Sequence, residues 1–371
     1  MQQPGGFRAF IPKPLPPEPP LRVTPKIQGQ LERASHALGL LDGSVLTLPN
    51  PDLFVMMYIR KEAVLSSQIE GTQSSLQDVL AAEARMFSPE RPKDVREVIN
   101  YVDAIRYGLE LLKTLPVSIR LIREIHERLL KDVRGRDQTP GELRRSQNWI
   151  GVGGCTLNEA TFIPPPPAEL PQALSDWEKF LHGGDDLPLL IKVGLAHAQF
   201  ETIHPFLDGN GRIGRLLITF LLVNKGVLHM PVLYLSHYFK QHRQQYYDRL
   251  QDIRESGRWE EWISFFLQGV AEVSKQAAET AGRILRLRER HRERITANLG
   301  RAAGNGLKVL EHLFEHPIAD VTEVKKLIGT AYPAANQLLR RLAEQGVVVE
   351  ITGRKRNRRF AYNEYIALFA N

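Results

Sequence analysis

The chain has almost no cysteine and no long uncharged apolar run, and these two absences narrow its class. A single cysteine among 371 residues, Cys155, excludes an internal disulfide framework and a zinc site built from several cysteines. No stretch is long enough and free enough of charge to span a bilayer, and residues 1–27 lack the apolar core of a signal peptide. We therefore expect a cytoplasmic protein with no membrane partner.

Basic residues outnumber acidic residues only modestly. The 49 Lys and Arg residues against 42 Asp and Glu give a net charge of +7, which fits an anionic ligand, a nucleic acid or neither. Apolar residues make up 43% of the chain and charged residues 25%, which is ordinary for a soluble globular protein. The length exceeds that of one typical domain, so we expect two or three hydrophobic cores.

The most informative segment is residues 204–215, which read HPFLDGNGRIGR. Gly209 and Gly211 lack a Cβ atom and can adopt the φ > 0 conformations in which successive N–H groups form an anion-binding nest. An apolar pattern of helical spacing starts at Ile213. The glycine turn would therefore place the N-terminus of a helix, with its unpaired N–H donors, against a bound phosphate.

Four ionisable side chains accompany this turn. Arg212 and Arg215 lie three residues apart and can hold phosphate oxygens in bidentate fashion. Asp208 is a hard oxygen ligand of the type that Mg²⁺ prefers when phosphates supply the other ligands. His204 is the side chain most readily tuned to accept a proton near neutral pH. Each feature alone is more often packing, turn chemistry or surface charge, but their joint order favours transfer of part of a nucleoside triphosphate.

Residues 204–215 resemble the signature of Fic-domain proteins, H-x-F-x-[D/E]-G-N-G-R-x-x-R, and meet every fixed position. The resemblance implies transfer of AMP from ATP to a Ser, Thr or Tyr hydroxyl of the protein itself or of a target protein. It implies that His204 deprotonates the hydroxyl, that Asp208 holds Mg²⁺ and that Phe206 anchors the loop. The residues implied for ATP and its anion hole are Gly209, Asn210, Gly211, Arg212, Ile213, Gly214 and Arg215.

A second motif, SSQIEG, occupies residues 66–71. A helix that ends at Gly71 would put Glu70 at the unfavourable end of the helix dipole, although a solvated helix-end glutamate is the plain alternative. The segment is similar to the inhibitory helix of Fic proteins, [S/T]-x-x-x-E-[G/N], with Ser66, Glu70 and Gly71 in place. The resemblance implies that Glu70 pairs with Arg215 and denies it to the γ-phosphate of ATP.

Residues 137–170 are rich in Gly and Pro and interleaved with β-formers, which predicts a loop and a β-hairpin. A hairpin edge beside an active site can bind an extended segment by β-augmentation, and an ordinary surface hairpin is the alternative. By resemblance to the Fic flap, Thr161, Phe162 and Ile163 would position the target. The same resemblance places Tyr247 near the nucleotide, although such tyrosines are more often core residues.

The character of the sequence changes beyond Gly306. Three helical patterns, a β-like segment at 347–351, a basic turn at 353–359 and a strand at 360–362 predict a winged helix-turn-helix. Its third helix and basic wing would bind DNA, or the domain would serve dimerisation or target docking. The arginine-rich run of residues 270–295 predicts a solvated connecting helix.

The expected fold is mainly α, a Fic-type helical core with a β-hairpin flap and a C-terminal winged helix-turn-helix domain. We expect an inhibitory helical region at 1–115, a catalytic core at 116–270, a connecting helix at 271–300 and the winged helix at 301–371. Within the first 267 residues, helices are expected at 27–41, 53–71, 95–115, 118–130, before Ile203, after the motif, at 234–254 and at 259–267. Expected partners are ATP, a protein substrate, DNA and a second copy of the chain. Two alternatives to AMP transfer are a DNA-binding regulator with a nucleotide-sensing site and removal of AMP from a modified target.

Overall fold

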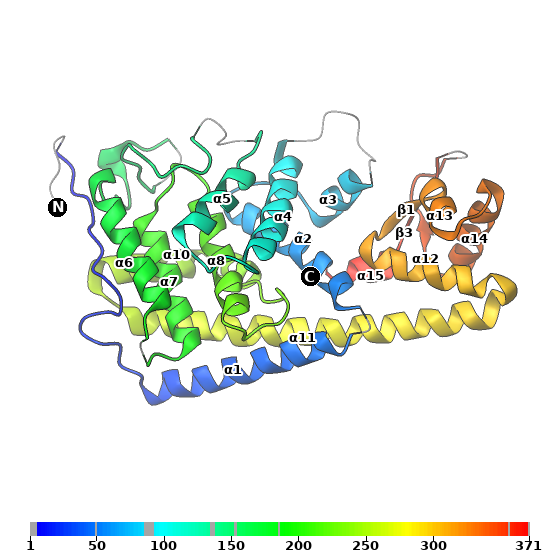
Figure 1. Cartoon of the computed structure of the whole chain (residues 1–371), viewed down its shortest axis with the longest axis horizontal. Coiled ribbons are helices and arrows are strands. Elements are labelled where there is room, and N and C mark those ends of the chain that lie inside the picture. The colour runs from blue at the N-terminus through cyan, green and yellow to red at the C-terminus, as the bar shows by residue number, and fades with distance from the viewer. Residues whose placement is uncertain are drawn as a thin grey trace.

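The computed structural model describes residues 6–48, 50–84, 93–133, 138–151, 154–184, 186–354 and 357–369, and these are mainly helical, with one small sheet (Figure 1). The first ten helices are α1 (Pro25–Leu46), α2 (Pro51–Ile69), α3 (Leu76–Glu83), α4 (Lys93–Leu111), α5 (Ile119–Leu129), α6 (Leu170–His182), α7 (Leu189–Ile203), α8 (Asn210–Asn224), α9 (Ser236–Gln241) and α10 (Arg243–Ser256). The elements that follow are α11 (Trp259–Asn298), α12 (Ala303–Glu315), β1 (Ile318–Asp320), α13 (Val321–Ile328), α14 (Tyr332–Glu344), β2 (Val349–Glu350), β3 (Arg359–Ala361) and α15 (Asn363–Ala367).

A long helix, α11, joins the two ends of the molecule. Its 40 residues span about 60 Å at the usual rise of an α-helix. In Figure 1 the shorter α1 runs beside part of α11, and the two helices pack against each other. The contact is apolar because both helices bury residues at three- and four-residue spacing, among them Ala34, Leu38 and Leu41 of α1.

The sequence predicts two separate helices, at 259–267 and 270–295, and the structure has one. The expected boundary at residue 270 lies inside α11, which passes through Gly269 without a break. A Cβ atom at Gly269 would lie 2.6 Å from Cδ1 of Tyr238. This glycine therefore serves the close approach of α9 and does not end the helix.

The other predicted helices are present with shifted ends, and three differences stand out. The expected helix at 234–254 is divided at His242, whose backbone (φ −110°, ψ 37°) leaves the helical region. Helices α3 and α6 were not expected from the sequence. A capping box stabilises the N-terminus of α3: the side chains of Ser75 and Asp78 each accept a hydrogen bond from the other's backbone N–H group.

Helices α7 and α8 form the centre of the core and carry the loop 204–209 between them. Fourteen of the 15 residues of α7 are buried, from Leu190 to Ile203. Helices α2, α4 and α5 pack against α8. The loop therefore emerges where elements from three separate parts of the chain meet.

The predicted β-hairpin at 137–170 is wrong as a pair of strands. Within the described part of this segment, one bridge, Ile150 to Phe162, is all that pairs. Side chains satisfy the neighbouring carbonyls instead: Gln147 donates to the Pro164 carbonyl and Trp149 to the Cys155 carbonyl. A ladder cannot extend here because the prolines at 164–167 have no N–H to donate.

The C-terminal elements follow the order that the sequence predicts, with β1 and α15 added. The sheet has the order β1-β3-β2 and is antiparallel, with Ala319 opposite Phe360 and Val349 opposite Ala361. Lys355 and Arg356, two residues of the expected basic wing, lie outside the described residues. Arg358 contacts the Asn336 side chain.

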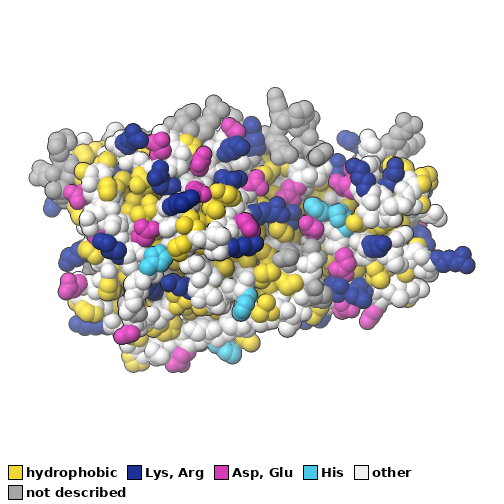
Figure 2. All heavy atoms as spheres, viewed as in Figure 1, with side chains coloured by type: hydrophobic (Ala, Val, Ile, Leu, Met, Phe, Trp, Pro, Cys, Tyr) yellow, Lys and Arg dark blue, Asp and Glu magenta, His cyan; other side chains and the backbone are white. Residues whose placement is uncertain are grey.

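This C-terminal part touches α2 directly. Arg60 donates to the Glu315 carbonyl at 3.2 Å, and the Phe369 ring lies 5.4 Å from that of Tyr58. Figure 1 accordingly shows the end of the chain beside α2. On the face in Figure 2, basic and acidic side chains are interspersed over the whole length. Among the described residues, no helix is long and apolar enough to cross a membrane.

We expect Gly108→Ala to destabilise the protein. Gly108 of α4 faces α8 and α5 so closely that a Cβ atom would lie 2.6 Å from the Phe220 ring and 3.0 Å from Ile125. Overpacking of this kind costs about 1–3 kcal/mol. Chemical denaturation should show the loss. Gly39→Ala is the matched control, because a Cβ atom there meets nothing within 4 Å. An equal or higher stability for Gly108→Ala than for Gly39→Ala would contradict the packing.

Candidate active site

His204 ends α7 in a left-handed conformation, with φ 49° and ψ 61°. Such a conformation costs a non-glycine residue about 1–3 kcal/mol and persists only where the surroundings impose it. Here two side chains hold the His204 carbonyl: Arg144 Nε donates to it at 3.0 Å and Asn148 Nδ2 at 3.3 Å. The imidazole is therefore presented by a fixed backbone.

The loop after His204 is braced across its base. The Phe206 N–H donates to Asn210 Oδ1 and Asn210 Nδ2 donates to the Phe206 carbonyl, both at 2.8 Å. The Phe206 side chain is fully buried and anchors the loop in the core. Both ends of the Asn210 amide are used in this brace, so a ligand would meet the backbone of Asn210 and not its side chain.

His126 of α5 contacts the same loop through its ring. Its ring stacks on Phe206 at 3.8 Å between centroids, and Nε2 lies 2.9 Å from the Asp208 carbonyl. The Gly141 N–H donates to Nδ1 at 2.9 Å, so Nδ1 is unprotonated and Nε2 carries the hydrogen. Burial, the largest cause, lowers the pKa of His126 to about 4, and the ring stays neutral.

The N-terminus of α8 is suited to an anion. Its first intrahelical bond runs from the Ile213 N–H to the Gly209 carbonyl at 3.1 Å. The N–H groups of residues 210–212 precede that bond and have no acceptor within the helix. Gly209 adopts φ 79°, as the predicted turn requires. The predicted anion cradle therefore consists of first-turn N–H groups.

Arg215 is buried, and three oxygens of α2 surround it. Its Nε donates to Ser66 Oγ at 2.8 Å, and its Nη2 donates to the Ser66 carbonyl at 3.0 Å and to Glu70 Oε1 at 2.8 Å. Burial on its own would raise the pKa of Glu70, but attraction to Arg215 outweighs it and the pKa lies below its usual value. Glu70 is thus ionised at neutral pH.

The Glu70 carboxylate also covers the start of α8. It follows the last residue of α2, and Gly71 next to it takes φ 99°, which favours glycine. A Cβ atom at Gly211 would lie 2.3 Å from Glu70 Oε1, so the carboxylate rests on the first turn of α8. Glu70 therefore places a negative charge where the N–H groups and the helix dipole favour one.

The remaining motif residues divide between the site and the core. The Arg212 guanidinium is 2% exposed, 3.4 Å from Asp208 Oδ1 and 3.8 Å from Glu97. Ile213 is a core residue whose N–H is already engaged, so it has no group to offer a phosphate. A side chain at Gly214 would collide with Glu201, since a Cβ atom there would lie 2.2 Å from its Oε1.

Asp208 is suited to bind a metal ion that takes its other ligands from a substrate. Its side chain is 36% exposed, and Oδ1 accepts the Gly209 N–H at 2.6 Å. The described residues contain no cluster of three or more His, Cys, Asp or Glu side chains that could hold a metal ion. A single partly exposed carboxylate fits Mg²⁺ held mainly by phosphate and water oxygens, as the sequence predicts.

The His204 imidazole is partly buried and neutral. Burial, followed by the positive charges of Arg254 and Arg144, lowers its pKa to about 3. A neutral imidazole accepts a proton, so His204 meets the first requirement of a general base over the whole physiological pH range.

The predicted flap and nucleotide residues lie around this centre. Phe162 is buried, while Thr161 is exposed and Ile163 partly exposed. The Arg254 guanidinium lies 3.9 Å from the centroid of the Phe162 ring. Tyr247 of α10 is 37% exposed, and its pKa is raised first by burial and then by the charge of Glu70. The structure thus brings Tyr247 within electrostatic reach of the Glu70 carboxylate.

Several residues that hold the site carry no sequence signal. His126, Glu97, Arg144 and Asn148 lie outside the motif and act through hydrogen bonds or charge on its loop. His197 of α7 also lies outside the motif, and its Nδ1 is 2.8 Å from the Gly214 carbonyl. For Glu97, His126 and His197, a polar residue among the apolar positions of a helix is the signal that could have suggested the position, whereas Arg144 and Asn148 lie outside the helices and have no such signal.

Comparison with known proteins agrees with this geometry. Residues 28–110 match the Fic/DOC family N-terminal model and residues 116–222 match the Fic/DOC family model, together about half of the chain. A protein adenylyltransferase Fic of Drosophila grimshawi is 30% identical over 223 residues, 56% of this chain and 43% of that protein. The Aedes aegypti protein of the same name is 33% identical over 170 residues, 43% of this chain and 31% of its own length. The match thus spans less than half of these relatives.

Solved structures show the same fold. A Fic family protein from Desulfovibrio desulfuricans G20 has a TM-score of 0.62 at 19% identity, over 93% of this chain and 98% of that one. A Fic domain containing signaling protein from Bacteroides thetaiotaomicron has a TM-score of 0.53 at 19% identity, over 69% of this chain and 97% of that one. With the two matching family models and the loop geometry, these likenesses establish that the chain is a member of the Fic/DOC family.

Proposed function

We propose that this protein transfers AMP from ATP to a hydroxyl of a protein side chain and that its own α2 restrains the reaction. One arrangement carries the proposal: a neutral His204 stands at one end of a loop whose other end is a helix N-terminus with the buried Arg215 close behind. A base, an anion site and a phosphate-binding cation are the parts that phosphoryl-type transfer needs. The relatives named protein adenylyltransferase Fic support the same chemistry.

The proposed reaction assigns a role to each of these groups. The His204 imidazole takes the proton of the target hydroxyl, and the oxygen attacks the α-phosphorus of ATP. The bond from the α-phosphorus to the bridging oxygen breaks, and pyrophosphate leaves. The first-turn N–H groups of α8 would stabilise the negative charge that builds up on the phosphate oxygens.

Two acidic residues have opposite roles in this proposal. Asp208 would hold Mg²⁺, which when bound neutralises phosphate charge. Glu70 would exclude phosphate, because its carboxylate already occupies both the first turn of α8 and Nη2 of Arg215. ATP would then bind in an unproductive pose until Glu70 moves away.

Removal of AMP from a modified target is a second candidate for the same site. The side chain of Glu70 is 33% exposed and its pKa is lowered, so an ionised carboxylate within reach of solvent could orient a water. DNA binding is less favoured, because Arg358 and Arg359 of the basic turn already contact Asn336 of α14 and Asp320, respectively. A homodimer stays a prediction.

Glu70→Gly should raise AMP transfer by more than about tenfold, which is about 1.4 kcal/mol in barrier height. The reason is that the substitution removes the Glu70 carboxylate from Nη2 of Arg215 and from the first turn of α8. Purified protein is incubated with Mg²⁺ and α-labelled ATP, with and without cell lysate, and label in protein is counted. Adding His204→Ala should then lower the rate by about 10²–10⁴-fold, because the base is lost.

Two further variants make this comparison specific. Glu142→Gly removes an exposed partner of Arg145 and should change nothing. Glu70→Gln keeps the shape of the side chain over Gly211 but removes its charge, so it should give an intermediate rate. An unchanged or lower rate in Glu70→Gly would refute restraint by α2, and absence of label from every variant would refute AMP transfer.

The rate should not follow an ordinary histidine titration. The base form of His204 is the neutral one, which is populated above its pKa, and a pKa of about 3 keeps it populated throughout pH 5–8. We therefore expect kcat/KM of the Glu70→Gly variant not to fall as the pH is lowered through 6.5, because His204 is not protonated there. Burial raises the pKa of the neighbouring Glu201 to about 7, so the profile is repeated with Glu201→Gln. A fall in kcat/KM centred near pH 6.5, with and without Glu201→Gln, would contradict a His204 that stays neutral.

A further inference from the structure

The N-terminal segment crosses the face of the molecule that the flap occupies. In Figure 1 this segment, residues 6–24, runs down the left-hand end before α1 begins. The Phe10 N–H donates to the Ile163 carbonyl at 2.9 Å, and Gln199 Nε2 of α7 donates to the Lys13 carbonyl at 2.7 Å. We call residues 6–16 the strap.

The strap binds at the edge of the flap that does not pair with Ile150. Ile150 and Phe162 exchange both backbone hydrogen bonds, at 2.8 and 3.0 Å, so the polar groups of Phe162 point toward Ile150. Since these groups alternate along an extended chain, those of Ile163 point to the opposite edge. Phe10 therefore binds where an added strand would bind.

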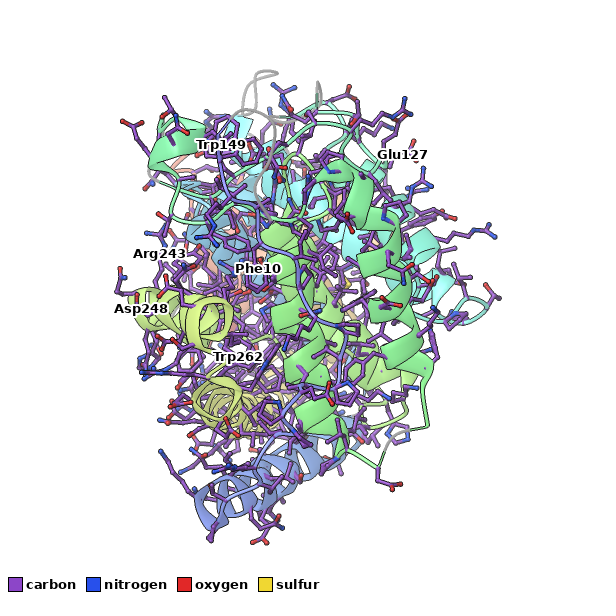
Figure 3. All side chains as sticks on the ribbon, turned by 90° about the vertical axis from the view of Figure 1, so that its left-hand side faces the viewer. Phe10, Glu127, Trp149, Arg243, Asp248 and Trp262 are labelled. Carbon is purple, nitrogen blue, oxygen red and sulfur yellow. The ribbon has the colours of Figure 1, made fainter. Side chains whose placement is uncertain are left out.

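Side chains reinforce the backbone contact. The Phe10 ring lies 5.8 Å from that of the buried Phe162, on which the Arg254 guanidinium also rests at 3.9 Å. Arg254 in turn donates to the Glu201 carbonyl at 3.2 Å, in the last turn of the helix that ends at His204. Figure 3 shows Phe10 at the end of the molecule where Trp149 and Arg243 also lie. The strap thus sits on a surface connected to the proposed base.

The composition of the strap is the decisive feature. Residues 1–23 contain no Ser, Thr or Tyr, so this part of the chain has no side-chain hydroxyl to accept AMP. Ala9 and Leu15 of the strap are buried, and prolines at 12, 14 and 16 limit the backbone freedom that binding would otherwise remove. The strap has the extended form of a bound target without an acceptor.

We propose that the strap is a pseudosubstrate, which holds the target-binding edge of the flap until a target segment displaces it. This inference rests on the proposed AMP transfer. The partner that fits is an extended, hydroxyl-bearing segment with an aromatic or large apolar side chain in the place of Phe10. Glu70 would then restrain ATP while the strap restrains the target, and the two restraints are separate because they contact different elements.

Hydrogen exchange tests the strap without any catalysis. In the full chain, the Phe10 amide should exchange slowly, and Phe162→Ala should speed its exchange toward that of an unstructured chain, because Phe10 loses the ring on which it packs. Ile11→Ala is the matched control, since the side chain of Ile11 is exposed and should not affect the edge. Unprotected exchange of Phe10 in the wild-type protein would overturn the proposal.

Binding and activity measurements then ask whether the strap competes with targets. Phe10→Pro removes both the N–H donor and the ring. A fluorescein-labelled peptide of residues 6–16 should bind this variant and not the wild type. In the Glu70→Gly background, Phe10→Pro should raise the labelling of added lysate proteins roughly five- to thirtyfold, the factor that about 1–2 kcal/mol gives, with KM for ATP unchanged.

The outcomes separate the two proposals. If the peptide binds but no variant incorporates label, the proposed AMP transfer fails while the strap still occupies the edge. If Glu70→Gly incorporates label and Phe10→Pro leaves both its rate and its peptide binding unchanged, the pseudosubstrate is wrong and AMP transfer stands. An increase in label with Ile11→Ala as large as that with Phe10→Pro would also overturn the specific role of Phe10.

Discussion

Burial of the Arg215 charge is the constraint on which the rest of the site depends. A guanidinium taken out of water needs oxygen partners, and the three that hydrogen-bond it among the described residues belong to Ser66 of α2 and to Glu70, which directly follows α2. The position of α2 is therefore fixed by the same residue that a nucleotide would use. In the proposed mechanism, the helix that supplies these partners would for that reason also keep phosphate away from Arg215.

The neighbouring residues extend this dependence outward. Glu62 of α2 accepts from Ser236 and from Tyr101, and the Tyr101 hydroxyl also lies 3.4 Å from the Arg212 carbonyl. Nearer its N-terminus, α2 carries Arg60, which donates to the C-terminal part of the chain. One helix thus connects the first turn of α8, the core and the C-terminal elements, and its displacement would change contacts in all three.

Local sequence patterns identified most helices and the motif loop, because apolar spacing and glycine conformations are decided within a few residues. Local sequence patterns failed where a residue distant in the chain determines the conformation of a segment. The predicted boundary at residue 270 is absent because α11 continues through Gly269, against which Tyr238 packs. The predicted hairpin at 137–170 is absent because side chains such as Gln147 bond its carbonyls. Ile213 fitted the motif, but its helix turns it into the core.

The sequence by itself determined which groups are available for chemistry: a histidine, a carboxylate, a glycine turn and two arginines in one fixed order. Only the tertiary structure decided how these groups are held. It placed Glu70 on Gly211, kept His204 neutral by burial and nearby arginines, and laid Phe10 along the flap. The physical reason is that spacing within a segment is local, whereas burial, electrostatic fields and edge pairing arise between segments far apart in the chain.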